Sequence, residues 1–397
     1  MVVKISVIGQ GYVGLPIALA AYEAGYDVYG IDNDVHKIAV LNSYKSVVED
    51  ITDYQIKEAL TSTRYHVSTD VKLVSESEII LICVPTPLLE DRTPDLRFLI
   101  SAVNSVGKNL TAGSLVIIES TVEPRTTRDL LVPLLEKSSG LKRSDFFIAF
   151  SPERIDPGNS KWNVKNTPKL VAGLTEGARD KAVEFYSRFI DKLVKCESLE
   201  IAETAKLLEN SFRLVNISFI NELTIFCHKL EIDVIDVIDA ASTKPYGFMS
   251  FYPSIGVGGH CIPVDPIYLT HKAREIGAPT RFIDLANQIN LEIPGYFVGR
   301  AEEKLGGLKN KKVLVVGVSY KPNVADVRET PVEALISGLI RRGALVSWHD
   351  NLVKEWNGSK SVVLSSNYDL AIIATPHDYL DLTKLGNVPI LNTRGSI

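Results

Sequence analysis

The sequence has few of the features that mark secreted, membrane-spanning or nucleic-acid-binding proteins. Its four cysteines are scattered without metal-type spacing, so we expect neither a disulfide framework nor a bound metal. There is no run of lysine and arginine and the net charge is −5, which leaves no basic footprint for nucleic acid. The longest apolar runs, such as 79–84, have the length of a strand and are too short to span a membrane.

The composition is that of a globular protein. The chain has 397 residues, of which 45% are hydrophobic, and this length suits two or three domains. The first residues enter a strand pattern directly, so we expect no signal peptide. Together with the scattered cysteines, this predicts a cytoplasmic protein.

Strand and helix signals alternate over the first 120 residues. Continuous apolar strands are typical of a parallel sheet that is buried on both faces. The pattern predicts a doubly wound α/β domain. Its expected strands are 2–8, 27–31, 79–84, 115–119, 147–150 and 170–172, with a helix over 15–24.

The pattern changes near Ser198. Residues 200–231 contain no glycine or proline and carry apolar side chains on more than one face, which predicts a long helix buried on several sides. Such a helix suits a domain spine or a dimer interface. A second α/β unit begins near Lys311. We therefore expect two Rossmann-like doubly wound domains joined by a helical central domain, with bounds of 1–197, 198–300 and 301–397.

A glycine motif opens the first predicted helix. Gly9, Gly11 and Gly14 form a GxGxxG pattern after a strand, where glycines permit the turn, the approach of a pyrophosphate and close helix packing. Asp32 closes the next strand, where an acid accepts from ribose hydroxyls and repels a 2′-phosphate, so NAD is favoured over NADP. Lys37 could soften that choice. The alternative is a glycine turn that binds no nucleotide.

Polar residues follow three further strands, at the edge of the sheet where such folds bind cofactors. Thr86 and Thr121 place hydroxyls there that suit the nicotinamide side or an ordered water, and their alternative is to cap the strand ends. Glu153 and Arg154 follow the strand at 147–150 and could bring a carboxylate and a guanidinium to the mouth of the site. The alternative for these two residues is a surface ion pair.

One face of the predicted long helix carries polar residues. Lys206, Asn210 and Arg213 lie at i, i+4 and i+7, hence on the same side. Lys206 and Asn210 interrupt an apolar neighbourhood, and an ammonium and an amide there could donate to an alkoxide or oxyanion. The alternative is a solvated stripe.

Cys261 stands in an unusual segment, GGHCIPVDP, at 258–266. A lone cysteine is more often a core residue than a nucleophile. Here the flanking glycines are expected to leave the backbone open to a ligand, and the prolines to stiffen the chain. The residues concerned are Gly256, Gly258, Gly259, Pro263 and Pro266.

Charged groups are expected around Cys261. His260 and Asp265 flank it with ionisable groups, and Lys206 could favour the thiolate form. His260 fits a structural role as well as a catalytic one.

The last α/β unit offers two cations. Lys321 and Arg328 follow its first predicted strand and suit a phosphate or sugar. The alternative for Arg328 is an ion pair with Asp326 or Glu329.

Taken together, these motifs resemble the UDP-glucose/GDP-mannose dehydrogenase family along nearly the whole chain. In family order they are GxGYVGLP, VPTP, STV, SPER, AKLLEN at 205–210, GGHCIPVDP and KPNVADVRETP. The sequences of the motifs SPER, STKPYGF at 242–248 and GGHCIPVDP are similar to those of the UDP-N-acetylhexosamine branch. They are closest to those of UDP-N-acetylglucosamine 6-dehydrogenases, with UDP-N-acetylmannosamine dehydrogenases as near relatives.

The resemblance implies a reaction. It is the four-electron oxidation of the C6 hydroxyl of a UDP-N-acetylhexosamine to the uronate with two NAD⁺, for polysaccharide or glycan precursor synthesis. A thiohemiacetal and then a thioester would form on Cys261 and be hydrolysed. The resemblance also implies a homodimer built on the long central helix and a C-terminal domain that binds the UDP moiety.

The resemblance assigns roles residue by residue. Cys261 would be the nucleophile, Lys206 and Asn210 the oxyanion-stabilising pair, Asp265 the acid near the hydrolytic water, and Glu153 and Thr121 the residues that place or activate that water. The cofactor would be bound by Gly9, Gly11, Tyr12, Val13, Gly14, Asp32, Lys37, Thr86 and Thr121. The substrate would be bound by Arg154, Ile155, Lys206, Asn210, Arg213, Phe251, Tyr252, Ser254, Gly258, Lys321 and Arg328.

The sequence departs from the family pattern at two places. Arg125 replaces a glycine that the family usually has after STV, which could change cofactor affinity. Lys244-Pro245 stands where other branches have an arginine that contacts the sugar of the adjoining subunit, which puts that contact in doubt.

Other functions remain open at this stage. The sugar could have the GlcNAc, ManNAc or glucose configuration. A two-electron hydroxy-acid dehydrogenase without a covalent step would also use a Rossmann domain and a long helix. A nucleotide-binding sensor or scaffold without activity is the third hypothesis.

Overall fold

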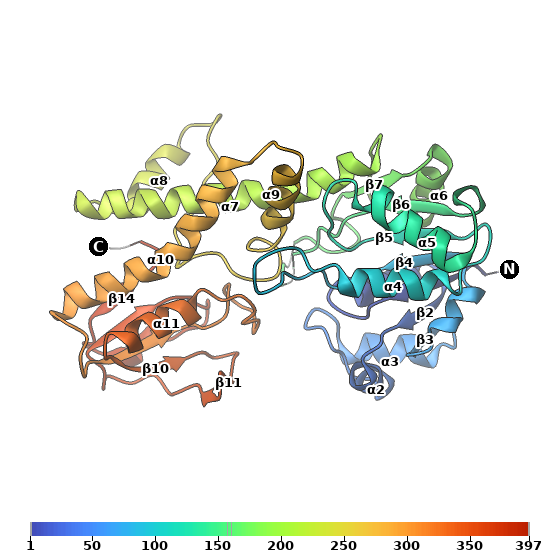
Figure 1. Cartoon of the computed structure of the whole chain (residues 1–397). Coiled ribbons are helices and arrows are strands. Elements are labelled where there is room, and N and C mark those ends of the chain that lie inside the picture. Colours follow the sequence, from blue (N-terminus) through green and yellow to red (C-terminus); the bar gives the residue numbers. More distant parts are fainter. Residues whose placement is uncertain (1, 157, 160, 396–397) are drawn as a thin grey trace. The chain divides into compact units, whose positions relative to one another are not determined.

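The computed structural model describes residues 2–156, 158–159 and 161–395, which form two compact units (Figure 1). The first unit runs to Leu208 and also includes Ile267–Lys272; the second takes the other described residues from Glu209 onward. Each unit is mixed α/β and built around a sheet with parallel strands. The predicted fold class of two doubly wound domains and a long central helix is therefore confirmed.

The sheet of the first unit has eight strands in the order β3-β2-β1-β4-β5-β6-β7-β8. Neighbours run parallel except β6 and β7, which pair antiparallel. The strand order reverses between β1 and β4, and ligands bind at such a switch point, outside the carboxyl ends of the strands. The strands are β1 Lys4–Ile8, β2 Asp27–Ile31, β3 Tyr65–Ser68, β4 Ile79–Ile82, β5 Leu115–Ile118, β6 Phe147–Phe150, β7 Lys169–Gly173 and β8 Leu193–Lys195.

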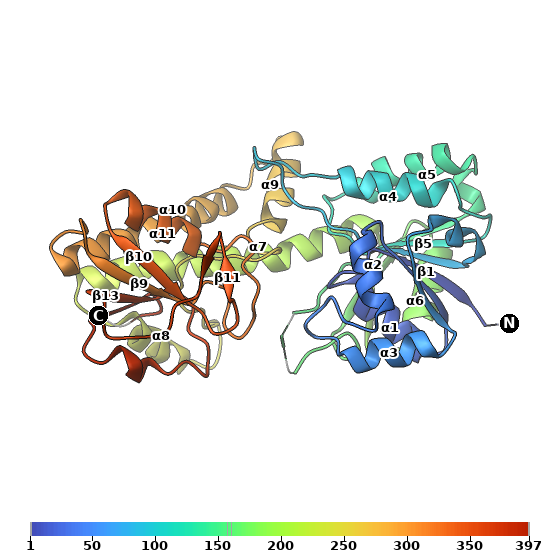
Figure 2. The same ribbon diagram turned by 90° about the horizontal axis from the view of Figure 1, so that it is seen from below.

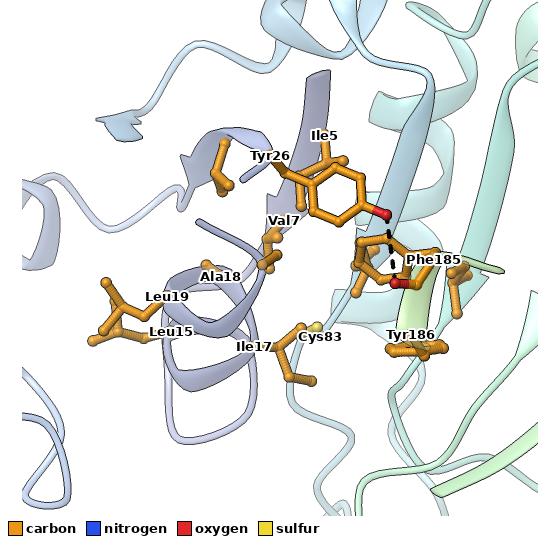
Figure 3. Packing of buried hydrophobic residues seen from close by; sticks show 14 of the residues in the cluster. Ile5, Val7, Leu15, Ile17, Ala18, Leu19, Tyr26, Cys83, Phe185 and Tyr186 are labelled. Carbon is orange, nitrogen blue, oxygen red and sulfur yellow. Dashed lines mark hydrogen bonds between the residues drawn. The ribbon is translucent and has the colours of Figure 1, made fainter. Parts of the chain in front are cut away.

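Helices cover both faces of this sheet because its strands are apolar on both sides. Along β1, Ile5 and Val7 enter one buried cluster and Ile8 enters the other. Figure 3 shows the first cluster, where α1 packs on β1 and Tyr26 donates to the carbonyl of Phe185. Figure 2 shows α1 and α3 on one side of the sheet and α4 and α5 on the other. The helices are α1 Gly14–Glu23, α2 Val35–Asn42, α3 Asp53–Thr61, α4 Arg97–Gly107, α5 Val132–Ser139 and α6 Glu176–Tyr186, with short helical turns η1 Val71–Glu76, η2 Thr127–Leu131 and η3 Arg143–Asp145.

The predicted long helix is present as α7, which has 31 residues, Leu199–Lys229. The chain leaves the helix at Glu231, whose φ of 57° is left-handed. Asp233 then accepts from the backbone N–H of Ile235 and begins the next helix. The helices that follow are α8 Val234–Ser242, α9 Asp265–Glu275 and α10 Arg281–Leu305.

The second unit contains a four-stranded parallel sheet in the order β10-β9-β13-β14. Side chains of α10 and α11 cover one face, and side chains from 362–368 and 380–388 cover the other. The strands are β9 Lys312–Val316, β10 Leu345–His349, β13 Leu370–Ile373 and β14 Ile390–Asn392. The remaining elements are the hairpin of β11 Glu355–Trp356 and β12 Ser359–Lys360, helix α11 Val332–Arg341 and turn η4 Leu382–Leu385.

The two sheets share a local layout at their first strands. In the first unit, Gly9 follows β1 with a φ of +94°, and Asp32 follows β2. In the second unit, Gly317 follows β9 with a φ of +84°, and Asp350 follows β10. In each case the amide just after the glycine donates to the aspartate, at 2.8 Å in the first unit and 2.9 Å in the second.

Candidate active site

The three glycines after β1 are needed for different physical reasons. A side chain on Gly9 would lie 2.7 Å from the carbonyl oxygen of Cys83, and one on Gly14 would lie 1.8 Å from that of Gly9. Both positions are therefore needed for packing within the protein. A Cβ on Gly11 would meet nothing within 4 Å. Gly11 leaves open space at the start of α1, where a pyrophosphate can approach backbone amides.

Asp32 is fixed beside this turn. Its carboxylate accepts from the backbone N–H of Gln10 at 2.8 Å and of Asp34 at 3.0 Å. Lys37 forms an ion pair with it at 2.6 Å. The acid is thus held where a ribose diol would lie, and the lysine that could soften the choice of cofactor contacts it directly.

The loops after β4 and β5 lie side by side, because these strands are neighbours in the sheet. They carry Thr86 and Thr121 at the carboxyl edge, and the hydroxyl of Ser120 ties them together by donating to the carbonyl of Val84 at 2.7 Å. Tyr268 in α9 donates to the carbonyl of Thr86 at 3.1 Å. These contacts hold both threonine-bearing loops in place.

The loop after β6 carries the next pair of candidates. Glu153 accepts from the backbone N–H of Ile155, within its own turn. Arg154 donates to the carbonyl of Pro168 at 2.6 Å, so its guanidinium braces the loop against the chain before β7. Glu153 and Arg154 line a small cavity of about 20 Å³, together with Lys169.

The predicted polar face of α7 is largely buried. Lys206 is 7% exposed and Asn210 is 2% exposed, so a solvated stripe is the wrong interpretation for these two residues. Asn210 donates through its amide to Asp265, and Arg213, which is exposed, donates to the amide oxygen of Asn210. Asn210, Arg213 and Asp265 therefore form one hydrogen-bonded group in the second unit.

Cys261 differs from the other cysteines. It is exposed, whereas Cys83, Cys196 and Cys227 are buried. Burial raises the pKa of the Cys83 thiol, and the negative charge of Glu119 adds to that effect. Only Cys261 is accessible, and its carbonyl accepts from the backbone N–H of Asp265 at 2.8 Å, one helical turn further on.

The glycines around Cys261 correct one prediction. We expected Gly256, Gly258 and Gly259 to leave the backbone open to a ligand. Instead, a Cβ on Gly258 would lie 2.6 Å from the carbonyl of Glu329, and one on Gly259 would lie 2.7 Å from the ring of Tyr320. A Cβ on Gly256 would meet Asn290 and Pro331 at 3.1 Å. These glycines let the cysteine loop pack tightly on segment 320–331, and the rigid loop then presents Cys261.

His260 is half-buried in this loop. Burial lowers its pKa, and the nearby positive charge of Arg328 lowers it further, so the imidazole is neutral near pH 7. Arg328 itself forms the ion pair with Asp326 that the sequence offered as its alternative, with Nε at 2.9 Å from Oδ1.

The other predicted substrate residues lie in or beside the same loop region. Ser254 donates its backbone N–H to Asn221 at 2.8 Å, and its hydroxyl contacts the backbone of Gly256 at 3.2 Å. Phe251 packs edge-on against Phe212, with ring centroids 5.6 Å apart. Tyr252 is exposed. Lys321 lies with its ammonium 5.9 Å from the ring centre of Tyr320.

Two buried acids were missed by the sequence analysis. Glu203, one turn before Lys206 on α7, accepts from the backbone N–H groups of Arg125 at 2.6 Å and Thr127 at 3.0 Å. Glu119, at the end of β5, forms a buried ion pair with Lys169 at 2.6 Å. The available signal was an acid inside or beside an apolar stretch, which requires a buried partner.

Comparison with known proteins identifies the family of the chain. Three family models match: the NAD binding domain of the UDP-glucose/GDP-mannose dehydrogenase family at residues 3–190, its central domain at 200–292 and its UDP binding domain at 314–393. The chain belongs to the UDP-glucose/GDP-mannose dehydrogenase family. It is accordingly an NAD-dependent oxidoreductase that acts on UDP-sugars. Within the described residues, no helix is both long and apolar enough to cross a membrane.

Relatives of this family resemble the chain over nearly its full length. A UDP-N-acetyl-D-glucosamine 6-dehydrogenase of Salmonella typhi is 35% identical, covering 94% of this chain and 90% of its own. The solved structure of a UDP-D-ManNAc dehydrogenase from Pyrococcus horikoshii has a TM-score of 0.90 at 31% identity and covers 98% of this chain and 95% of its own. A UDP-glucose dehydrogenase structure from Pyrobaculum islandicum has a TM-score of 0.91 at 26% identity, covering 99% and 94%.

The dehydrogenase departs from its family pattern at Arg125, and the backbone there explains the usual glycine. Arg125 has a φ of +80°, in the left-handed region that favours glycine. Its side chain forms an ion pair with Asp129 at 2.9 Å, on the surface. Such an exposed pair offsets little of the backbone strain. At the second departure, Lys244 lies with its ammonium 5.0 Å from the ring centre of Tyr246.

We expect Arg125→Gly to stabilise the dehydrogenase by roughly 0.5–1 kcal/mol. Removing a left-handed non-glycine residue relieves about 1–2 kcal/mol, part of which is offset by the greater freedom of glycine in the unfolded chain. Urea unfolding measures the change. Arg143→Gly, at a position without left-handed geometry, is the control and should destabilise. A loss of stability in Arg125→Gly would show that the ion pair with Asp129 outweighs the strain.

Proposed function

We propose that this dehydrogenase oxidises the C6 hydroxyl of a UDP-N-acetylhexosamine to the carboxylate, through a covalent intermediate on Cys261. The observation that carries the proposal is the single exposed thiol, held on a rigid loop one turn before Asp265. Asp265 in turn contacts Asn210 on α7. A nucleophile, an acid and an amide donor thus belong to one connected group.

The cofactor site suits NAD. Gly11 leaves open space beside backbone amides, and Asp32 holds a carboxylate for the ribose hydroxyls. When bound there, NAD⁺ supplies the hydride acceptor for each of the two oxidations. The residues that would hold it are those of the turn after β1, Asp32 with Lys37, and the threonines Thr86 and Thr121.

The residues of the chain then act in sequence. After the first oxidation, the Cys261 thiolate adds to the C6 aldehyde, and Lys206 and Asn210 donate to the oxyanion that forms. The resulting thiohemiacetal loses its C6 hydrogen as hydride and its hydroxyl proton, which gives a thioester. Water hydrolyses the thioester, releases the carboxylate and returns the thiol. Asp265 assists the proton transfers, and Glu153 and Thr121 place the water.

The overall balance is one alcohol, two NAD⁺ and one water to one carboxylate, two NADH and three protons. Covalent attachment keeps the aldehyde from escaping between the two cofactor exchanges. Thioester hydrolysis makes the sequence irreversible.

An N-acetylated sugar is supported by the relatives named above, of which one acts on UDP-N-acetyl-D-glucosamine and another on UDP-D-ManNAc by name. The relative named for UDP-glucose makes that sugar the second candidate. Arg154, Ile155, Arg213, Phe251, Tyr252, Ser254, Gly258, Lys321 and Arg328 are the residues proposed to bind the substrate. Arg328 would exchange its ion pair with Asp326 for the ligand.

Cofactor stoichiometry tests the proposal. The purified protein is incubated with excess NAD⁺ and limiting UDP-N-acetylglucosamine, UDP-N-acetylmannosamine or UDP-glucose, and NADH is followed by its absorbance. Two NADH per N-acetylated sugar is the expected result. One NADH per substrate would favour a two-electron dehydrogenase. Tight binding of NAD⁺ or UDP-sugar without NADH would favour a sensor or scaffold.

We also propose a homodimer through α7. Five large apolar side chains on this helix, and Leu230 directly after it, are 46% to 61% exposed. Their spacing of seven, four, seven, seven and four residues puts them on one side of the helix. A second copy of the chain would cover this α7 stripe, since an apolar seam on a helix pairs well with an identical one. The α7 stripe consists of Ile201, Leu208, Phe212, Phe219, Phe226 and Leu230.

Phe226→Glu is expected to dissociate the dimer. A charge within an apolar seam loses its hydration on association, which should weaken the dimer by at least about 2 kcal/mol, or roughly 30-fold in Kd. Sedimentation velocity over a range of concentrations measures this. Val363→Glu changes a residue that is equally apolar and 80% exposed in another part of the second unit, and should leave the dimer intact. An unchanged Kd in Phe226→Glu would place the interface elsewhere.

A thiol nucleophile must remain reduced. The exposed Cys261 is therefore consistent with the cytoplasmic location that we propose.

A further inference from the structure

A buried charged cluster lies directly behind the loop that carries Glu153. It contains Glu119, Lys169 and Tyr186, all buried. Lys169 donates to the carboxylate of Glu119 at 2.6 Å, and Tyr186 donates to the other oxygen of that carboxylate. Figure 3 shows Tyr186 beside the apolar cluster of this unit, so the group has hydrocarbon on the side of its tyrosine.

Lys169 also reaches the backbone of the loop. Its ammonium lies 3.4 Å from the carbonyl oxygen of Ser151 and 3.3 Å from that of Pro152. Together with Glu119 these acceptors use the three N–H donors of the ammonium. The lysine is thus bonded at once to a fixed acid below it and to the two carbonyls that precede Glu153.

The antiparallel direction of β7 explains this placement. The ladder between β6 and β7 pairs Ala149 with Gly173 and Phe150 with Ala172. Because β7 runs against β6, its first residue, Lys169, comes to the edge where β6 ends. A parallel β7 would have brought its last residue there instead.

Beyond the end of this ladder, side-chain hydrogen bonds connect the loop after β6 to the chain around the start of β7. The hydroxyl of Ser151 donates to the carbonyl of Leu170 at 2.7 Å, and the guanidinium of Arg154 donates to that of Pro168 at 2.6 Å. Lys169 supplies the third tether, between these two. Glu153 and Lys169 then line the same small cavity. Ser151 is still paired with β5, because its backbone N–H donates to the carbonyl of Ile118 at 3.0 Å. Toward β7, the loop is held by the side chains of Ser151, Arg154 and Lys169.

We propose that Lys169, held by Glu119 and Tyr186, is a positioning residue that fixes Glu153 for hydrolysis of the thioester. The inference rests on the proposed function, in which Glu153 places the hydrolytic water. A buried ion pair by itself adds little net stability, since the cost of removing both charges from water offsets their attraction. The hydrogen bonds from Lys169 to the loop carbonyls indicate that the ion pair of Lys169 and Glu119 holds the loop in position.

The expected effect is confined to one step. In Lys169→Met the aliphatic stem remains and the donors are lost, so Glu153 should shift and hydrolysis should slow by roughly 10- to 100-fold. The oxidations should still proceed, so that each active site releases two NADH in a fast burst before a slow steady state. The KM for NAD⁺ should be unchanged, because the turn after β1 is not touched. Lys169→Arg, which keeps the charge and the donors, should recover much of the hydrolysis rate.

A double-mutant cycle with Glu153→Gln separates positioning from a general structural role. If Lys169 acts through Glu153, Lys169→Met should slow a Glu153→Gln enzyme little further. Additive losses, or wild-type turnover in Lys169→Met, would overturn the proposal. Stopped-flow measurement of NADH gives burst and steady state together. Should Lys169→Met prove unstable, Glu119→Gln replaces it in the cycle, since it weakens the hold on the ammonium at constant volume, and the same outcomes apply.

The test also distinguishes the two levels of the argument. The proposed function fails if the wild-type enzyme does not yield two NADH per UDP-sugar. If it does yield two, and the cycle is additive, the function stands and the positioning role of Lys169 is wrong.

Discussion

Cys261→Ser is expected to lower steady-state turnover on the order of 10²- to 10³-fold, the scale of losing one catalytic group. A serine hydroxyl at this position is a weaker nucleophile than a thiolate and forms an ester that water cleaves slowly. The variant should therefore stop at or before cleavage of the acyl intermediate. Rapid mixing with NAD⁺ and UDP-sugar should show at most two NADH per site, and intact-protein mass spectrometry should detect any sugar that remains attached.

Cys196→Ser is the matched control. It makes the same atomic change at a thiol that is buried and lies 3.9 Å from the carbonyl of Val194, an acceptor that a hydroxyl can also use. Its turnover should stay near that of the wild type. Full steady-state turnover in Cys261→Ser would rule out the covalent mechanism and favour a two-electron dehydrogenase.

Gly14→Ala should damage the fold of the first unit, whereas Gly11→Ala should damage cofactor binding alone. The added methyl at Gly14 would lie 1.8 Å from the carbonyl oxygen of Gly9, so the start of α1 must move away from β1. Such overpacking costs roughly 1–3 kcal/mol. The methyl at Gly11 meets nothing within 4 Å of the protein, so the melting temperature should not change.

The same two variants should differ in affinity for NAD. In Gly11→Ala the methyl occupies the space where the pyrophosphate approaches the backbone, and we expect Kd to rise at least about tenfold. Isothermal titration with NAD⁺ and thermal unfolding without it measure the two effects separately. Wild-type affinity in Gly11→Ala would mean that the pyrophosphate does not approach this turn.

Much of the fold could be predicted from the sequence because its buried strands are continuous apolar runs. The strands predicted at 27–31 and 147–150 have the bounds found in the structure. The helix α10 was not predicted, because Pro294, Gly295 and Gly299 interrupt its pattern. Pro294 is accommodated in a helix whose neighbouring side chains are packed in the core, and tertiary packing of this kind overrides local propensity.

Only part of the candidate site could be predicted from the sequence. The glycine motif, Asp32 and the polar face of α7 follow from strand order and helical spacing, and these are local rules. The role of the glycines near Cys261 could not follow, because Tyr320 and Glu329 come from a distant part of the chain. The role of Lys169 could not be predicted for a similar reason, since only the antiparallel pairing of β7 brings it behind the loop of Glu153.

The first strands of the two sheets have the same layout, but the aspartates that follow them differ in their hydrogen-bond donors. Asp32 accepts from two backbone amides and from Lys37, a half-buried side chain whose ammonium a ligand hydroxyl would have to displace. Asp350 accepts from the backbone N–H groups of Val318, Leu352 and Val353 and from His377, and is 1% exposed. Four donors saturate a carboxylate. The second sheet therefore keeps the scaffold of a dinucleotide domain but cannot grip a ribose diol with its acid. Its carboxylate instead holds the backbone after β9 and β10 in place, so this acid has a structural role where Asp32 has a position suited to a ligand.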